Sequence, residues 1–171
     1  MIKRYVLEGA ANSGKTTLLH LLGKKGFQVC PEIATEIIER EQNIKGELLP
    51  WINRIAFDQE CLKQLIERYD SINHGIVFFD RAFTTNLAYH KMYGSCPECL
   101  EIIDKFHYDK IFLLERLPNY KKDKIRRFDN ETEDKIQSLI EKSCIELNYD
   151  LIHVPLMSSI EERIEFILKN L

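Results

Sequence analysis

The eight residues Gly9–Thr16 constrain this chain more than any other feature of its sequence. They read GAANSGKT and match the phosphate-loop pattern G-x-x-x-x-G-K-[ST] at every fixed position. The loop follows an expected strand, Lys3–Leu7, and opens an expected helix from about Lys15 to Lys25. Glycines let such a loop curl so that its N–H groups point inward, and the helix N-terminus adds the positive end of its dipole. The segment therefore predicts a site for the phosphates of a nucleotide.

Individual positions of this loop have distinct expected roles. Lys15 can reach the β- and γ-phosphates, and the Thr16 hydroxyl is placed to ligate Mg²⁺. The residues that we expect to hold the nucleotide are Gly9, Ala10, Ala11, Asn12, Ser13, Gly14, Lys15, Thr16 and Thr17. The loop alone does not separate kinases from GTPases, motors and regulatory ATPases, so the rest of the chain has to decide the class.

Short β-branched and aromatic runs alternate with longer segments of helical period along the chain. The expected strands are Lys3–Leu7, Phe27–Cys30, Ile76–Phe79, Lys110–Leu114 and Leu151–Val154. Helices are expected over about 15–25, from 31, from 50 to about 73, over about 131–148, and after Ser159, which forms a capping box with Glu162. No linker or repeat marks off a second unit, so we expect one α/β domain over residues 1–171 with a mostly parallel sheet.

The composition excludes several other classes of protein. A chain of 171 residues is about one domain, and its net charge of −3 is not the overall basic footprint of a nucleic-acid-binding protein. No stretch approaches the roughly 20 apolar residues of a membrane span, and the N-terminal segment is too short and too charged for a signal peptide. The five scattered cysteines do not form a disulfide framework. We therefore expect a cytoplasmic, reduced protein with no nucleic-acid or membrane partner.

An acid and a base follow the third expected strand. Asp80 comes directly after the apolar run Ile76–Phe79, where phosphate-loop proteins commonly place the acid that holds Mg²⁺ through water. Arg81 follows at once, and a positive charge there would compete with the metal ion. Its presence is explained if Arg81 pairs with a second anion or with the acid of a substrate site, although an ion pair of purely structural use is an alternative.

A second acid follows the second expected strand. Because the carboxyl ends of parallel strands share one edge of the sheet, Glu32 is expected to face the γ-phosphate from the acceptor side. A carboxylate there could orient an acceptor hydroxyl and take its proton. Glu36, one helical turn later, could be a second acid. The alternative for Glu32 is an acid in the first turn of a helix, favoured by the helix dipole.

A basic segment lies between the fourth and fifth expected strands. Residues 116–127 contain six basic residues and one acid, a net charge of +5, which leaves −8 for the rest of the chain. We expect a lid over about 116–130 in which Arg126 or Arg127 neutralises charge on the transferring phosphate. A solvated charge run and a nuclear-import patch are the alternatives.

These motifs together resemble the small P-loop kinases that phosphorylate nucleosides and nucleotides. The loop Gly9–Thr16, the Cys-Pro-Glu ending at Glu32, the Phe-Asp-Arg ending at Arg81 and the basic lid are most similar to the compact AAA-domain family that includes the ribosylnicotinamide kinase domain of bifunctional NAD-biosynthesis proteins. The resemblance implies a three-layer fold with a five-stranded parallel sheet in the order 2-3-1-4-5. It also implies use of ATP and Mg²⁺, Glu32 as the acceptor-side base and Arg126 as the lid arginine.

Two further segments of the sequence bear on which acceptor the protein would phosphorylate. The stretch from Asp80 to Phe83, with Ala88-Tyr89, is also similar to thymidylate kinases, whose second-strand motif differs from Cys-Pro-Glu. Gln59 resembles the position where nucleoside kinases bind a base, although a polar residue on a helix surface is the favoured interpretation.

The sequence thus favours ATP- and Mg²⁺-dependent phosphoryl transfer to a small hydroxyl-bearing acceptor, such as a nucleoside. The expected catalytic residues are Lys15, Glu32, Asp80, Arg81, Arg126 and Arg127, with Thr16 and Asp80 at the metal. A regulatory nucleotide-binding switch and a nucleoside monophosphate kinase are the rivals, although the N-K-x-D motif of guanine readers is absent. The acceptor and the oligomeric state, including a homodimer, stay open.

Overall fold

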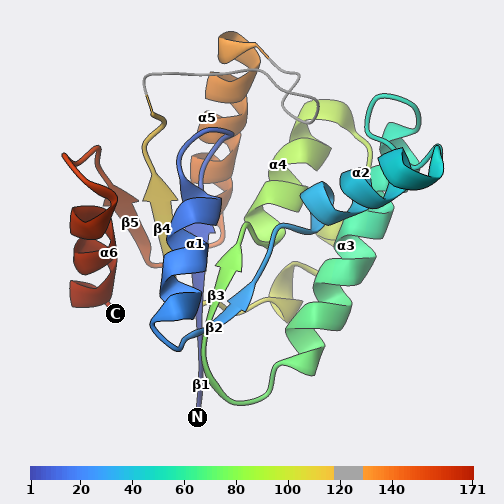
Figure 1. Cartoon of the computed structure of the whole chain (residues 1–171). Coiled ribbons are helices and arrows are strands. Elements are labelled where there is room, and N and C mark those ends of the chain that lie inside the picture. The colour runs from blue at the N-terminus through green and yellow to red at the C-terminus, as the bar shows by residue number, and fades with distance from the viewer. Residues whose placement is uncertain (118–128) are drawn as a thin grey trace.

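A computed structural model of the chain describes residues 1–117 and 129–171. Its five strands form one parallel sheet in the order β2-β3-β1-β4-β5 (Figure 1). The strands are β1 (Ile2–Glu8), β2 (Gln28–Cys30), β3 (Gly75–Asp80), β4 (Lys110–Leu114) and β5 (Leu151–Val154). The strand order expected from the resemblance is confirmed, and β4 and β5 have their predicted bounds.

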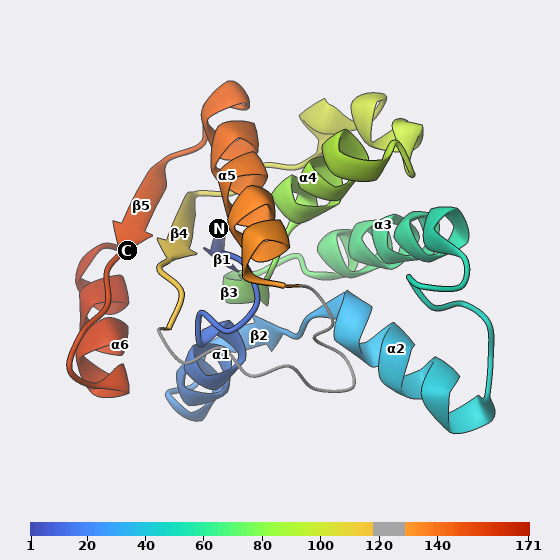
Figure 2. The ribbon, with the colours of Figure 1, turned by 90° about the horizontal axis from the view of Figure 1, so that it is seen from above.

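Helices cover both faces of this sheet. They are α1 (Lys15–Lys24), α2 (Ile33–Ile44), α3 (Arg54–Ser71), α4 (Phe83–Tyr93), α5 (Asn130–Glu146) and α6 (Ile160–Lys169), with short 3₁₀ turns at Pro97–Leu100 and Ile103–Lys105. Figure 2 shows α1 and α6 on one side of the sheet and α4 and α5 on the other. The result is the three-layer α/β arrangement that the sequence predicts.

The hydrophobic core follows from the alternation of side chains along the strands. On β1, Tyr5 and Leu7 pack with α1 and α6, whereas Val6 packs with the larger cluster under α3, α4 and α5. Because both faces of the sheet are covered, β3 is a continuous apolar run in which Val77, Phe78 and Phe79 are all buried.

Side-chain caps fix where several helices begin. The side chain of Asn53 accepts from the backbone N–H of Ala56 at the start of α3. Asp129 caps α5 in the same way, and Ser159 caps α6 by accepting from Glu162. Only half of the predicted capping box is present, because the Glu162 carboxylate accepts from Ser158 and not from the N–H of Ser159. Such caps contribute about 1 kcal/mol each.

Helix α4, over residues 83–93, is not among the helices expected from the sequence. This helix is buried on several sides, and its buried side chains include Thr84 and Thr85 as well as Phe83 and Leu87. It therefore lacks the one-sided apolar stripe by which an amphipathic helix is recognised. Within the described part of the chain, no helix is long and apolar enough to cross a membrane.

The structure describes only part of the expected lid over about 116–130. Arg116 and Leu117 are described at its beginning, and the backbone N–H of Leu117 donates to the carbonyl of Asn12 at 3.0 Å. Arg126 and Arg127 lie outside the described residues, so their expected roles remain predictions.

Candidate active site

The phosphate loop joins β1 to α1 through backbone conformations that favour glycine. Gly9 has φ 133°, and a Cβ there would lie 2.8 Å from the carbonyl oxygen of Leu114. Asn12 and Gly14 have φ 63° and 88°. Alternation of left-handed residues with ordinary ones turns successive N–H groups toward one side, the geometry that binds anions. The fixed glycines of the motif are therefore required by the backbone path of the loop.

Lys15 lies under the loop with its ammonium group in the site. Its side chain is buried, and Nζ donates to the carbonyls of Gly9 and Ala10, both at 2.8 Å, and to Oγ of Ser13 at 3.2 Å. Burial and the nearby Arg81 guanidinium lower the pKa of Lys15 to about 8, against the opposing effect of Asp80. A cation held in this way is ready to exchange carbonyl partners for phosphate oxygens.

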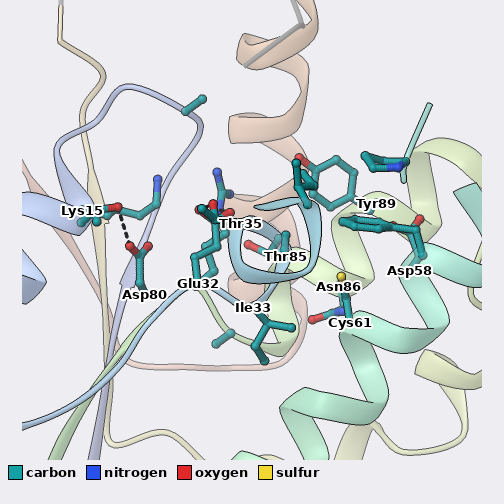
Figure 3. A pocket seen from close by; sticks show the side chains of 18 of the residues that line it. Lys15, Glu32, Ile33, Thr35, Asp58, Cys61, Asp80, Thr85, Asn86 and Tyr89 are labelled. Carbon is teal, nitrogen blue, oxygen red and sulfur yellow. Dashed lines mark hydrogen bonds and ion pairs between the residues drawn. The ribbon is translucent and has the colours of Figure 1, made fainter. Parts of the chain in front are cut away.

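Thr16 and Asp80 meet beside Lys15, as Figure 3 shows for Lys15 and Asp80. The Thr16 hydroxyl donates to Oδ2 of Asp80 at 2.8 Å, whereas the buried Oδ1 of Asp80 has no hydrogen-bond partner among the described residues. Burial and the charge of Glu32 raise the pKa of Asp80, against the opposing effect of Lys15. A carboxylate with one oxygen left over beside a hydroxyl fits a Mg²⁺ ion.

The described residues contain no group of three or more His, Cys, Asp or Glu side chains that could hold a metal by themselves. A magnesium ion at Thr16 and Asp80 would thus need oxygen ligands from elsewhere, which nucleotide phosphates and water supply.

Glu32 and Arg81 form an ion pair at the carboxyl ends of β2 and β3. Nε of Arg81 lies 2.6 Å from Oε1 of Glu32, and the Thr35 hydroxyl donates to Oε2 of Glu32 at 3.0 Å. Burial by itself would raise the pKa of Glu32, but Arg81 and Lys15 outweigh it, so the pKa lies below its ordinary value. Arg81 thus pairs with an acid, and Glu32 is held as an oriented carboxylate. This pair agrees both with a substrate-site role and with a purely structural role for Arg81, so the expected substrate-site role stays a prediction.

A cavity of about 770 Å³ runs from the phosphate loop past Glu32 and between α2, α3 and α4. Figure 3 shows Lys15 and Asp80 on one side of Glu32, and Tyr89 and Asp58 on the other. The loop residues that line it are Ala11, Asn12, Ser13, Gly14, Lys15, Thr16 and Thr17. Gly9 and Ala10 do not line it, so their expected contact with the nucleotide stays a prediction.

The end of the cavity distant from the loop is aromatic and carries one ion pair. Tyr89 and Tyr93 stack along α4 with ring centroids 6.2 Å apart. The Arg54 guanidinium lies over both rings, 4.4 Å from each centroid, and Nε of Arg54 donates to Asp58 at 2.7 Å. Aromatic side chains beside a few polar groups are typical of cavities that bind small organic ligands.

Two suggested residues lie outside this cavity. Glu36 is exposed and pairs with Arg68, because α2 turns that side of its first turn toward α3. It is therefore not a second acid of the site, and the expectation was wrong. Gln59 lies on the surface of α3 and donates to Glu98 at 2.7 Å, which agrees with the favoured interpretation of a polar surface residue.

Sequence reasoning missed Glu8, the last residue of β1. This carboxylate is fully buried and accepts hydrogen bonds from the hydroxyls of Thr84 and Thr85 and from the N–H groups of Gly9 and Ala82. It thereby ties the phosphate loop to the turn that carries Arg81. The sequence gives no signal for this role, because the two threonines that donate to Glu8 lie 76 and 77 residues further along the chain.

We expect replacement of Glu8 by Leu to destabilise the protein by about 3 kcal/mol, because it leaves buried hydroxyl and amide donors without an acceptor. For a chain of this size the melting temperature falls by about 6–12 °C. Glu8→Gln, which keeps the shape and one acceptor oxygen, should lose less. Thermal unfolding followed by circular dichroism checks both variants, and a Glu8→Leu protein that melts like the wild type would contradict the role.

Side chains of α5 and α6, in the C-terminal half of the chain, also form hydrogen bonds with the backbone of the phosphate loop. On α5, Glu133 accepts from the N–H of Ala11 at 2.8 Å and Gln137 accepts from the N–H of Ala10 at 2.5 Å. On α6, the buried Arg163 donates to the carbonyl of Ser13 at 2.7 Å. These contacts hold the phosphate loop from both sides, and nothing in the local sequence indicates them.

The chain matches one protein-family model and is similar in fold to several solved structures. A family model described as an AAA domain matches residues 4–163. None of the curated protein sequences compared with the chain matches it. A structure of NadR protein in complex with NR has a TM-score of 0.75 at 18% identity, with 98% of this chain and 51% of that chain covered. The chain therefore spans about half the length of that NadR chain.

Two shorter proteins are similar over nearly their whole length. Deoxyadenosine kinase from M. mycoides has a TM-score of 0.71 at 15% identity, with 98% of this chain and 97% of that chain covered. Thymidylate kinase from Ehrlichia chaffeensis has a TM-score of 0.63 at 16% identity, with 99% and 98% covered. At these identities the likeness establishes the fold, which is that of the P-loop nucleotide kinases.

Proposed function

We propose that the chain, which belongs to the AAA-domain family whose model it matches, is a small-molecule kinase, because its phosphate loop opens onto a cavity of about 770 Å³. It transfers the γ-phosphoryl group of ATP to a hydroxyl group of a small, nucleoside-like acceptor. Residues 1–171 act as one domain in this proposal, with a lid over about 116–130. The fold shared with a deoxyadenosine kinase and a thymidylate kinase supports an acceptor of this general size.

The donor side of the reaction belongs to the loop and its neighbours. Lys15 exchanges its carbonyl partners for oxygens of the β- and γ-phosphates, and the loop N–H groups bind the remaining charge. Thr16 and Oδ1 of Asp80, which has no hydrogen-bond partner among the described residues, would hold Mg²⁺, and the ion would neutralise charge on the phosphates. Arg126 or Arg127 from the lid would add positive charge on the far side.

The acceptor side belongs to Glu32. Its carboxylate takes the proton of the acceptor hydroxyl while that oxygen forms a bond to the γ-phosphorus, and the bond from phosphorus to the β–γ bridging oxygen breaks to release ADP. Arg81 and Thr35 keep the carboxylate ionised and oriented for this step. The observation that carries the proposal is this ionised pair, which lies between the phosphate loop and a cavity large enough for a nucleoside.

A screen of nucleosides and nucleotides for ADP release tests the proposal. We expect ADP to form at a rate that depends on a nucleoside-like acceptor and on Mg²⁺, with little ADP formed when ATP is the only substrate. ADP formation that no small molecule increases, but that a protein partner does, would favour the regulatory switch instead.

One observation favours a second candidate, a nucleoside monophosphate kinase. Nη1 of Arg81 is buried without a hydrogen-bond partner among the described residues, and a phosphate on the acceptor could supply one. Parallel assays of each nucleoside and its monophosphate separate the two. A kcat/KM at least tenfold higher for the monophosphates would replace the main proposal with this one.

A further inference from the structure

Arg163, near the start of α6, connects the phosphate loop to the carboxyl ends of β4 and β5. The residue is only 3% exposed, and its helix covers the same face of the sheet as α1 (Figure 2). Nη1 donates to the carbonyl of Ser13 in the loop at 2.7 Å. The other acceptors are the carbonyls of Glu115 at 3.0 Å, Val154 at 3.4 Å and Pro155 at 3.1 Å. The guanidinium therefore fixes one carbonyl of the loop relative to the sheet.

The hydrogen bond to Ser13 also determines the direction of the following N–H group. The peptide bond from Ser13 to Gly14 is trans, and the C=O and N–H of a planar trans peptide point in opposite directions. Because the carbonyl points toward Arg163, the N–H of Gly14 points away from it. Gly14 lines the cavity, and its N–H donates to no acceptor within residues 1–117 and 129–171. Arg163 thus leaves this donor available to a ligand of the loop.

Other N–H groups of the loop are already used inside the protein. The N–H of Ala10 donates to Gln137, and that of Ala11 donates to Glu133. A nucleotide phosphate therefore depends on the donors closer to α1, which include the N–H of Gly14. Rotation of the peptide between Ser13 and Gly14 would remove this donor and present a carbonyl oxygen to the phosphates in its place.

The charge of Arg163 acts in the same direction as this orientation. Burial lowers the pKa of Arg163, against the opposing effect of Glu115, but an arginine stays protonated at neutral pH. Glu115 is exposed, and its carboxylate accepts from the N–H of Leu156 at 3.1 Å. A Cβ built on Gly14 would lie 3.5 Å from Nη1 of Arg163. The guanidinium is thus directly behind the loop peptide, which it polarises into a stronger N–H donor.

We propose that Arg163 is a positioning residue for the nucleotide, which holds the N–H of Gly14 toward the phosphates and so raises the affinity of the loop for a diphosphate group. Arg163 acts through the peptide between Ser13 and Gly14 and does not touch the phosphates. The proposal rests on the proposed function, because it concerns the nucleotide of the same site. Since the ground state and the transition state both use this donor, its loss raises KM for ATP more than it lowers kcat.

Two variants and two ligands test the role by titration calorimetry. Arg163→Met removes every donor of the side chain, whereas Arg163→Gln keeps a donor at the place of Nε, for the carbonyl of Pro155, and cannot reach Ser13. ADP and inorganic pyrophosphate share the diphosphate group, and pyrophosphate has no nucleoside. We expect the dissociation constants of both ligands to rise about tenfold or more in both variants, the usual effect of losing one hydrogen bond to a charged group.

Kinetics and spectra separate positioning from a general loss of structure. With ATP and an acceptor, KM for ATP should rise about tenfold or more while kcat stays within about threefold of the wild type. In amide spectra of the ¹⁵N-labelled protein, pyrophosphate should move the Gly14 amide proton downfield in the wild type and much less in Arg163→Met.

A control variant on the same helix removes stability alone. Ile167, one helical turn after Arg163, is buried in the apolar core and does not line the cavity. Ile167→Ala leaves a cavity in that core and should lower the melting temperature. Its dissociation constant for ADP, measured well below that temperature, should stay at the wild-type value.

The outcomes separate this role from the kinase reaction. Wild-type dissociation constants in the folded Arg163 variants, an equal loss of ADP affinity in Ile167→Ala, or a wild type that binds neither ADP nor pyrophosphate would each overturn the positioning role. If Arg163→Met does not fold, Arg163→Gln decides by the same criterion. Diphosphate binding that depends on Arg163, without phosphorylation of any acceptor, would leave the positioning role standing and overturn the kinase reaction instead.

Discussion

Replacement of Lys15 by Ala is expected to abolish phosphoryl transfer, lowering kcat/KM for ATP by about 10³-fold or more. Lys15 is the side chain that the phosphate loop holds on its own carbonyls, 2.8 Å from both Gly9 and Ala10, in the position where phosphate oxygens are expected. Lys15 is the only basic residue of the loop Gly9–Thr16. A water molecule that fills the space left by its side chain would carry no charge to stabilise the phosphates. Steady-state kinetics with saturating acceptor measure the loss.

Controls keep this result interpretable. The buried side chain of Lys15 fills space, so Lys15→Met, which keeps most of its length without the charge, should lose as much activity as Lys15→Ala. The melting temperatures of both variants show whether the loop still folds. Near-normal turnover in either variant, with the protein folded, would remove the phosphate loop from the reaction.

Replacement of Glu32 by Gln is expected to lower kcat by about 10²- to 10⁴-fold, the usual contribution of a general base. The amide is nearly the same size but cannot take the proton of the acceptor hydroxyl. Affinity for ATP should change little, because the loop, Lys15 and Thr16 are untouched. Single-turnover rates and ATP titrations of the same preparation separate the two effects.

The same substitution leaves Arg81 without its counter-ion. An unpaired buried guanidinium is destabilising by itself, so a folding defect could imitate a catalytic one. The double variant Glu32→Gln/Arg81→Gln removes both charges and should regain thermal stability while turnover stays low. If Glu32→Gln turns over like the wild type, Glu32 is not the base.

The part of the site around the phosphate loop was predictable because its sequence signals are local. Gly9, Gly14, Lys15 and Thr16 stand at fixed spacings that the curled backbone itself requires, and Asp80 ends a run of apolar residues that a doubly covered strand needs. The strand order came from the resemblance of the motifs and agrees with the sheet. Glu32 was placed correctly at the cavity by the rule that parallel strands share their carboxyl edge.

The part of the cavity remote from the phosphate loop was not predictable, because it depends on tertiary contacts. Tyr89, Tyr93 and Arg54 come from α3 and α4, and α4 has no periodicity that reveals it. Glu133 reaches Ala11 across 122 residues of sequence. Glu36 was wrongly placed in the site because it follows Glu32 by one helical turn, a spacing that suggests a shared face. The packing of α2 against α3 decides which side chains face the cavity, and it pairs Glu36 with Arg68 instead.

The most direct test of the kinase account follows the γ-phosphate itself. Wild-type protein is incubated with Mg²⁺, ATP labelled in the γ-phosphoryl group and each nucleoside of the screen in turn, and the products are separated. The account predicts that the label appears in a phosphorylated nucleoside, and that it does not do so with Lys15→Ala or Glu32→Gln. Recovery of the label only as inorganic phosphate, whatever acceptor is present, would contradict it.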